Sequence, residues 1–307
     1  MAKDVSFEGV YPILPTPFDE REDVDLESFA RIVSFMAAIG ADGVTMLGVL
    51  GESGRMVDAE REALIRTAVA AAGGRLPVIV GTSHRGSRAA RELSRAAESL
   101  GADAVMVAPA SEPVPGDEPV VDLFREVADG ISVPLVVQDH PASTGVHMSV
   151  PLLLRLVSEI PRVACIKEEA PPTPVRIAAL RRGMTARRVP VLTGLGALYG
   201  LFELEAGCGG FMTGFAFPEV LIAMVREARE NRMEAARAIY ARFLPLIVFE
   251  QQPGVAVRKE IYRMRGLLAC GRVRRPGAGL APSAAGQLRD LLETVLPGVD
   301  ITKPIAV

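Results

Sequence analysis

Gly40-Ala41-Asp42-Gly43-Val44 recurs later in the chain, with one change, as Gly101-Ala102-Asp103-Ala104-Val105. Each copy follows a segment with helical spacing and places a glycine just past the end of that helix. Each copy also leads directly into a short run of β-branched and other apolar residues. A strand that follows a helix in the same way at two places is typical of repeated parallel βα units.

Eight such units can be counted before residue 230. The expected strands are Gly9 to Thr16, Gly43 to Leu47, Val78 to Gly81, Ala104 to Ala108, Pro134 to Asp139, Val163 to Lys167, Val191 to Thr193 and Gly210 to Thr213. The segments between them, such as Leu26 to Ile39, Asp58 to Ala71 and Arg88 to Leu100, have helical spacing. An open doubly wound sheet would carry a glycine-rich turn after its first strand, but Pro15-Thr16-Pro17-Phe18 stands there. The pattern therefore predicts an α/β fold, a closed (β/α)₈ TIM barrel.

The remaining residues, 231–307, read as three further helices. They are expected at Met233 to Phe249, Val255 to Arg265 and Pro282 to Leu296, and Pro253-Gly254 and Arg275-Pro276-Gly277 separate them. We expect residues 1–230 to form the catalytic barrel domain and residues 231–307 to form a C-terminal helical extension.

Composition limits the possible partners. The 307 residues are 49% hydrophobic, and 34 basic residues against 37 acidic ones give a net charge of -3, so no nucleic-acid partner is expected. Residues 1–4 do not begin an apolar signal segment, and every apolar stretch is interrupted well before the length of a membrane span. We expect a soluble cytoplasmic protein whose partner is a small molecule.

Cysteine and histidine spacing indicates neither a metal site nor a disulfide framework. The three cysteines and three histidines form no short ligand motif; they are Cys165, Cys208, Cys270, His84, His140 and His147. The sequence therefore predicts no metal and no cofactor.

Lys167 closes the run Val163-Ala164-Cys165-Ile166-Lys167, which lies between Pro161 and Pro171-Pro172. Its amine therefore ends an expected buried strand. In a water-poor pocket the ammonium form is disfavoured, and a neutral amine can add to a ketone to form a Schiff base. The alternative is a solvated lysine at a strand end. Catalytic groups of a barrel lie at the carboxyl ends of the strands, and this position favours the catalytic interpretation of Lys167.

Other strand ends supply further candidates. Gly48, Val49, Leu50, Gly51 and Glu52 follow the second expected strand, Gln138 and Asp139 end the fifth, and Thr193-Gly194 and Thr213-Gly214 end the last two. Side chains alternate along a strand, so only one of Gln138 and Asp139 faces inward, and Gln138 is preferred. Glu169 lies two residues beyond Lys167 and is a candidate proton carrier if it shares the inward side.

Each candidate also has a plainer interpretation. The segment 48–53 would then be a tight turn that binds nothing, and Glu52 a helix-start or packing carboxylate. Asp139 would cap a loop, and Glu169 would be a solvated loop charge. The glycines after Thr193 and Thr213 would only admit close helix packing. Cys165, two residues before Lys167, is expected to be a buried filler.

With Ile166-Lys167-Glu168-Glu169, Gly48-Val49-Leu50-Gly51-Glu52-Ser53 and the segment Pro141 to Gly145, the chain resembles the dihydrodipicolinate synthase and N-acetylneuraminate lyase superfamily. The likeness runs from Pro12 to the terminal helices. It implies a (β/α)₈ barrel with C-terminal helices, a Schiff base between Lys167 and a 2-keto acid, and a homo-oligomer, usually a tetramer. It also implies that the loop 48–53 holds the substrate carboxylate.

The chain departs from the synthase pattern at the substrate-binding positions. Val49 and Leu50 stand where the family has two threonines, Gln138 stands for a tyrosine and Ser143 for an arginine, while Ala110 and Ser111 roughly replace paired tyrosines. The resemblance therefore implies that synthase activity is less favoured.

The branch of 2-keto-3-deoxy-L-arabinonate dehydratases is more similar. The likeness lies in Val44 to Glu52, Gln138-Asp139-His140-Pro141, Met212-Thr213-Gly214-Phe215, Phe217-Pro218, Leu244 to Ile247, Val257-Arg258-Lys259 and Arg275 to Ala278. It implies a carbon-oxygen lyase in which Lys167 attacks the C2 ketone of a 2-keto-3-deoxy sugar acid. The histidine that follows the lysine in that branch is Glu168 here, so the acid and base stay open.

Two other functions fit the same residues. A class I aldolase would use Lys167 to break the C3–C4 bond and release pyruvate plus an aldehyde. A binding homologue without turnover would fit the missing hydroxyls at positions 49, 50 and 138.

Overall fold

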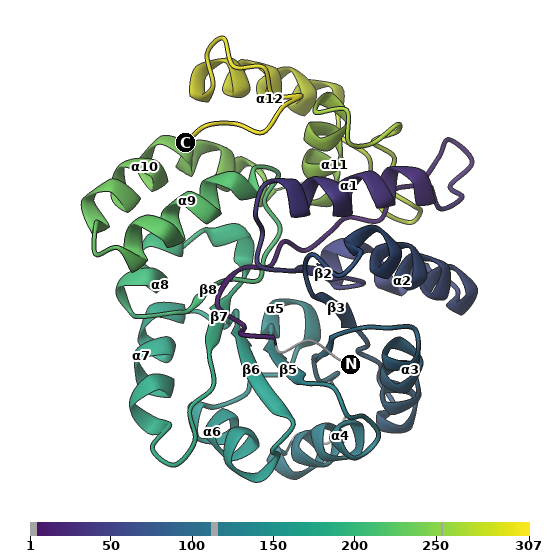
Figure 1. Ribbon diagram of the computed structural model, residues 1–307, viewed down its shortest axis with the longest axis vertical. Helices are drawn as coiled ribbons and strands as arrows, with labels where there is room; N and C mark the ends of the chain where they lie inside the picture. Colours follow the sequence, from purple (N-terminus) through teal and green to yellow (C-terminus); the bar gives the residue numbers. More distant parts are fainter. Residues whose placement is uncertain (1–4, 112–115, 253) are drawn as a thin grey trace.

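The computed structural model describes residues 5–111, 116–252 and 254–307. Eight parallel strands pair in the order β1-β8-β7-β6-β5-β4-β3-β2, and helices surround them (Figure 1). The strands are β1 (Gly9–Val10), β2 (Val44–Met46), β3 (Val78–Gly81), β4 (Ala104–Val107), β5 (Leu135–Asp139), β6 (Val163–Glu168), β7 (Val191–Thr193) and β8 (Gly210–Phe211). A parallel bridge between Ile13 and Thr45 joins the two ends of this order and closes the predicted (β/α)₈ barrel.

Helices follow the strands as the sequence predicts. The barrel helices are α1 (Leu26–Ala38), α2 (Asp58–Ala72), α3 (Ser87–Ser99), α4 (Asp117–Asp129), α5 (Pro141–Thr144), α6 (Val150–Glu159), α7 (Thr173–Gly183), α8 (Gly200–Glu205) and α9 (Pro218–Arg229). Three short 3₁₀ turns are η1 (Val49–Gly51), η2 (Ser53–Arg55) and η3 (Leu195–Ala197). Among the described residues, no helix has the length and apolarity that crossing a membrane requires.

The first strand is shorter than predicted. The sequence suggests Gly9 to Thr16, but regular pairing covers only Gly9–Val10, followed by the single bridge at Ile13. Pro12 and Pro15 lack the amide hydrogen that a continuous ladder needs, which explains the interruption. The last strand also ends early, at Phe211, although the Met212 amide still donates to the Thr193 carbonyl at 2.8 Å.

The three expected C-terminal helices are present as α10 (Met233–Phe249), α11 (Val255–Met264) and α12 (Pro282–Val295). Helix α10 packs against α9 and α12. The segment around α11 lies beside α1 (Figure 1), where the Ala269 amide donates to the Ser28 hydroxyl at 3.2 Å. Pro253, expected to separate α10 from α11, lies outside the described residues. The division into two domains at residue 230 stays a prediction.

The core has two layers that follow the alternation of side chains along the strands. The inner layer fills the barrel and consists of Val5, Phe7, Tyr11, Ile13, Ile79, Ala104, Met106, Val136, Cys165, Leu192 and Met212. The outer layer lies between strands and helices and contains Val137 and Ile166, the sequence neighbours of Gln138 and Lys167. This parity places the side chains of Gln138 and Lys167 on the inner side of the barrel.

Candidate active site

Lys167 lies near the carboxyl end of β6 with its side chain only 5% exposed. It pairs in register with Gln138 on β5 and with Leu192 on β7, and Leu192 belongs to the inner layer. The structure thus contradicts the alternative of a solvated lysine. Cys165, two residues earlier, is fully buried in the inner layer, and burial raises the pKa of its thiol, as expected for a filler residue.

Glu169 shares the inward side with Lys167. Its Oε2 atom lies 3.0 Å from Lys167 Nζ and accepts a hydrogen bond from Gln138 Nε2 at 2.7 Å, while Oε1 accepts from the Leu195 amide at 3.2 Å. Burial alone would raise the pKa of Glu169. The nearby Lys167 and His140, together with the hydrogen bond from Gln138, have a larger effect in the opposite direction, so this pKa lies below its ordinary value. The carboxylate is thus charged and held directly beside the amine, which contradicts the alternative of a solvated loop charge.

Gly194 makes room for this carboxylate. A Cβ atom added to Gly194 would lie 1.9 Å from Glu169 Oε1, a distance that no side chain permits. The glycine therefore does more than admit helix packing, because it allows Glu169 to reach the backbone of η3.

A cavity of about 140 Å³ lies next to Lys167. Its lining comes from the carboxyl sides of six strands, from the segment between α10 and α11 and from α11 itself: Ile13, Gly48, Val49, Leu50, Gln138, His140, Lys167, Glu169, Leu195, Gly196, Thr213, Gly214, Glu250, Gln251, Gly254 and Arg258. We call it the inner cavity. A wider cavity of about 800 Å³, the outer cavity, shares Gly48, Val49 and Gln138 with it and extends past Ser83, Ser111 and Ser143. A short molecule fits the inner cavity, and a longer one would extend into the outer cavity.

The loop after β2 contributes only part of its expected residues. Gly48, Val49 and Leu50 line the inner cavity, whereas Gly51 does not, and its carbonyl accepts from the Thr16 hydroxyl at 2.6 Å. Neither Val49 nor Leu50 carries a side-chain hydrogen-bond donor.

Glu52 points away from the inner cavity. Its Oε1 is paired with Lys259 Nζ, while its Oε2 lies 2.6 Å from Arg55 Nη1 and accepts from the Arg274 amide at 3.0 Å. Although Glu52 is among the residues that border the outer cavity, its carboxylate anchors the loop to the C-terminal segment. The packing interpretation of Glu52 therefore fits the structure better than substrate binding.

Asp139 also lies outside the inner cavity, because its neighbour Gln138 takes the inward position. Its Oδ2 is 2.6 Å from Arg176 Nη2, and Arg176 Nε is 3.1 Å from Glu168 Oε1. Burial raises the pKa of Asp139 to about 6 and that of Glu168 to about 7, against the opposing effect of Arg176. The preference for Gln138 as the inward residue is confirmed, and the expectation that Asp139 contacts substrate is not supported.

The two threonine–glycine pairs behave differently. Thr213 and Gly214 line the inner cavity, and Thr213 Oγ1 accepts from the Gly196 amide at 2.7 Å. Thr193 follows the inward Leu192 and therefore faces the helix side, near Glu203 of α8. Burial raises the pKa of Glu203 to about 7.

Sequence reasoning missed four residues with polar side chains that line the inner cavity: His140, Glu250, Gln251 and Arg258. Burial lowers the pKa of His140, so the imidazole is neutral near pH 7, and its Nδ1 lies 2.6 Å from the Ser143 hydroxyl. His140 directly follows Gln138-Asp139 and could have been selected as a strand-end residue. The other three follow α10 or lie on α11, and no local pattern brings them to the barrel mouth.

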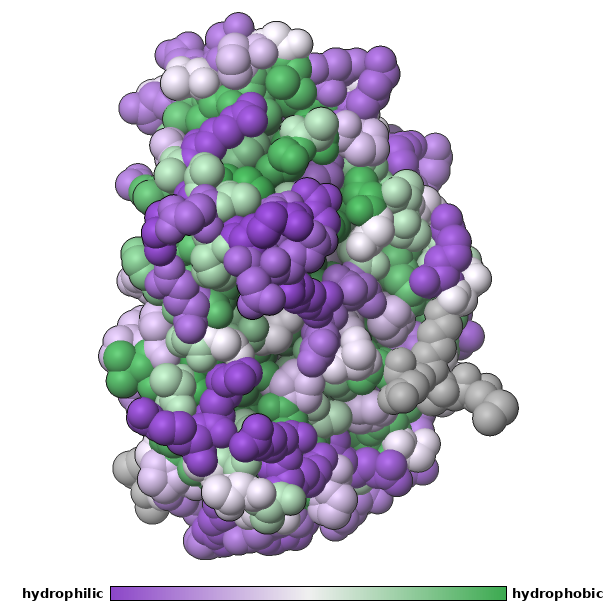
Figure 2. Space-filling model, turned by 60° about the vertical axis from the view of Figure 1, so that its left-hand side comes forward, coloured by the Kyte–Doolittle hydropathy of each residue, from purple (hydrophilic) through white to green (hydrophobic). Residues whose placement is uncertain are grey.

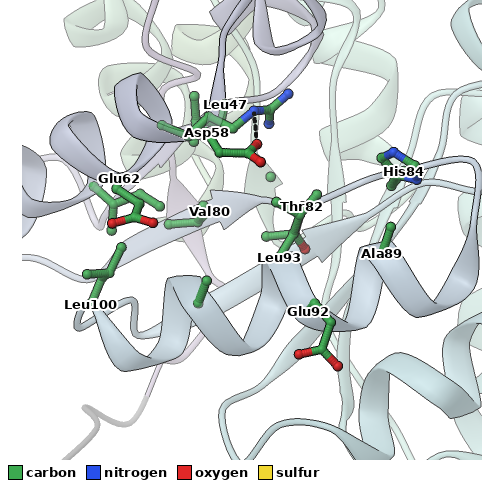
Figure 3. Close-up of a pocket in the computed structure, with 14 residues that line it drawn as sticks. Leu47, Asp58, Glu62, Val80, Thr82, His84, Ala89, Glu92, Leu93 and Leu100 are labelled. Atoms are coloured by element: carbon green, nitrogen blue, oxygen red, sulfur yellow. Dashed lines mark ion pairs between the residues drawn. The ribbon is translucent and has the colours of Figure 1, made fainter.

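A third cavity, of about 360 Å³, lies between α2 and α3 (Figure 3). Leu47, Val80, Leu93 and Leu100 give it an apolar lining, and acidic residues including Glu62 stand among them (Figure 3). It contains no lysine, so it offers no amine for covalent chemistry. Among the described residues there is also no cluster of three metal-ligating side chains. The inner cavity is therefore the candidate active site.

The model of the dihydrodipicolinate synthetase family matches residues 6–295. The chain belongs to this family. Members of this family are lyases. In this chain, Lys167 lies buried beside Glu169 at the barrel mouth.

Similar members of the dihydrodipicolinate synthetase family carry different names. L-2-keto-3-deoxyarabonate dehydratase from Azospirillum brasilense is 37% identical over 91% of this chain and 92% of its own length. A 4-hydroxy-tetrahydrodipicolinate synthase from Persephonella marina is 31% identical over 94% and 98% of the two chains. The crystal structure of dihydrodipicolinate synthase from Rhodopseudomonas palustris superimposes with a TM-score of 0.91 at 34% identity, covering 96% of this chain and 99% of that one.

Proposed function

We propose that the protein is a Schiff-base-forming lyase that dehydrates a 2-keto-3-deoxy sugar acid such as 2-keto-3-deoxy-L-arabinonate. The observation that carries this proposal is the buried contact of 3.0 Å between Lys167 Nζ and Glu169 Oε2 in a cavity at the barrel mouth. The 37% identity to a dehydratase with that substrate supports the choice of reaction.

The first step is attack of the Lys167 amine on the C2 ketone. Glu169 is the nearest carboxylate to accept a proton from the ammonium, which frees the lone pair on nitrogen. The carbinolamine then loses water, and the product is an iminium ion. Gln138 holds Glu169 in place through its bond of 2.7 Å to Oε2.

The iminium ion makes the C3 protons acidic. A base removes one of them, and the resulting enamine expels the C4 hydroxyl as water. In a five-carbon substrate a proton then moves from C5 to C3, the enol at C4 and C5 becomes an aldehyde, and hydrolysis of the iminium frees Lys167. Glu169 and the neutral His140 both line the cavity and are the candidate acid and base. Gln138 lies where the two cavities meet and can orient a hydroxyl or water there.

The test is product identification on five- and six-carbon 2-keto-3-deoxy acids. From a five-carbon acid the dehydratase releases a semialdehyde and from a six-carbon acid a 2,5-diketo acid, whereas the competing aldolase would release pyruvate from either. Borohydride reduction in the presence of pyruvate tests the Schiff base itself, because it converts the iminium into a stable mass adduct on Lys167. A wild-type protein without any adduct would instead support the binding homologue without turnover.

We also propose a homo-oligomer in the cytoplasm, with neither nucleic acid nor membrane as partner. Hydrophobic areas alternate with hydrophilic ones on the face that Figure 2 brings forward. Several large hydrophobic side chains of helices α7, α8 and α10 and of the turn before α8 are exposed: Val175, Tyr199, Phe202 and Val248. Light scattering of the purified protein tests the oligomeric state, and a monomer at all concentrations would contradict this proposal.

A further inference from the structure

Arg258 carries an unused hydrogen-bond donor at the inner cavity. The residue lies on α11 and is 2% exposed. Its Nε donates to Glu250 Oε2 at 3.2 Å and its Nη2 donates to the Gly214 carbonyl at 2.7 Å. Its Nη1 has no hydrogen-bond partner in the part of the chain that the structure describes. A buried guanidinium nitrogen without a partner is costly, which suggests that a ligand supplies the missing acceptor.

Arg258 Nη1 lies directly beside Gly214. A Cβ atom added to Gly214 would lie 2.2 Å from Arg258 Nη1 and 2.9 Å from Leu50 Cδ1. The unused donor therefore lies over the end of β8, close to the loop after β2. This is the loop from which the resemblance led us to expect the carboxylate contacts, and its Val49 and Leu50 side chains provide none.

The charges of the inner cavity favour an anion at Arg258. Of the charged groups that line it, Lys167 reacts with the ketone carbon, while Glu169 and Glu250 would repel a carboxylate. His140 is neutral near pH 7 because burial lowers its pKa. Arg258 is the one remaining cation in this described lining, and guanidinium–carboxylate hydrogen bonds are among the strongest in proteins.

The shape of the site separates the two ends of the substrate. Arg258 and Lys167 both line the inner cavity, and neither lines the outer cavity. A 2-keto acid places its carboxylate one bond from the carbon that Lys167 attacks, so both groups must share the inner cavity. The hydroxylated tail then extends past Gln138 into the outer cavity, away from Arg258.

We propose that Arg258 Nη1 binds the carboxylate of the 2-keto acid, in place of side-chain donors in the loop after β2. This inference rests on the proposed function, because it takes a Schiff base at Lys167 as given. It makes Arg258 a substrate-binding residue and Gly214 the position that leaves space for it.

The test compares borohydride trapping of pyruvate with that of methyl pyruvate, its neutral ester. Arg258→Gln alone would leave the Glu250 carboxylate buried without its cation, whereas the amide oxygen introduced by Glu250→Gln still accepts a hydrogen bond from Arg258. The matched pair is therefore Glu250→Gln and Glu250→Gln/Arg258→Gln, which differ only in the guanidinium. We expect the half-saturating concentration of pyruvate to rise about tenfold or more in the double variant, since a charge-assisted hydrogen bond is lost. Methyl pyruvate should trap equally in both variants, which also shows that Lys167 remains functional.

Equal half-saturation of pyruvate in the two variants would overturn this inference alone. Weaker binding of the 2-keto-3-deoxy sugar acids with unchanged binding of pyruvate would also overturn it, because Arg258 would then contact the hydroxylated tail of the substrate. A wild-type protein that traps neither compound would overturn the proposed function and the inference with it.

Discussion

Glu52 and Lys259 form a buried ion pair that joins the loop after β2 to helix α11. The Lys259 side chain is fully buried and that of Glu52 is 1% exposed. Lys259 Nζ also donates to the Arg272 carbonyl at 2.8 Å and lies 4.3 Å from the centre of the Phe18 ring. Burial lowers the pKa of Lys259 to about 8, although Glu52 opposes this shift. The pair fixes the position of the preceding residue on α11, Arg258, relative to the loop Gly48–Leu50.

Replacing Lys259 with Met should destabilise the protein, because Glu52 loses a buried partner. We expect a loss of about 2–4 kcal/mol in the free energy of unfolding. Urea unfolding followed by circular dichroism measures it. The double variant Glu52→Gln/Lys259→Met should recover part of the loss, since no buried charge is left without its partner.

The control is Lys303→Met, which removes an exposed lysine that lies 3.1 Å from Asp300. Such surface pairs contribute about 0–1 kcal/mol. If Lys259→Met and Lys303→Met had the same small effect, the buried pair would not hold the loop as we argue.

Lys167→Met should abolish the borohydride adduct with pyruvate and lower turnover at least about a thousandfold, because no other lysine of the described residues lines the inner cavity. Mass spectrometry of peptides from the trapped wild type should locate the adduct on Lys167. Lys303→Met, whose lysine side chain is 77% exposed, should trap pyruvate like the wild type. An adduct of normal yield on Lys167→Met would refute the assignment of the nucleophile.

Gly194→Ala should displace Glu169, since the new Cβ would lie 1.9 Å from its Oε1 atom. We expect turnover to fall by about a hundredfold, in line with the loss of a positioned acid–base group. The matched control is Gly286→Ala on α12, where a Cβ meets no atom within 4 Å. This control should leave turnover unchanged and raise helix stability by up to about 1 kcal/mol. Equal turnover in the two variants would show that Glu169 needs no such space.

Local patterns predicted the strand that carries Lys167 well, because alternation of side chains decides which residues face the barrel. The same rule selected Gln138 over Asp139 and placed Glu169 beside Lys167. No local rule could find Arg258 or Glu250, because the packing of α11 and the end of α10 against the barrel mouth brings them there. The sequence did not decide whether Glu52 binds substrate or serves in packing for the same reason, since its partner Lys259 is distant in the sequence.

Glu203 should make the stability of the protein depend on pH. Its carboxyl is buried on α8, its Oε1 accepts from the Thr173 hydroxyl at 2.5 Å, and burial raises its pKa from 4.5 to about 7. The fold therefore favours the protonated form. The resulting stabilisation is complete below about pH 4.5 and is lost as the pH rises through about 7.

Glu203→Gln keeps a neutral group of the same shape at every pH and should lack this loss. The free energy of unfolding of the variant, relative to the wild type, should rise by roughly 2–3 kcal/mol between pH 4.5 and pH 8. Urea unfolding of both proteins at the two pH values measures the difference. The other buried carboxyls with a raised pKa, Asp139, Glu168 and Glu250, are common to both proteins and cancel in the comparison. A difference that stays constant, or that falls as the pH rises, would show that Glu203 is already ionised in the folded protein well below pH 7.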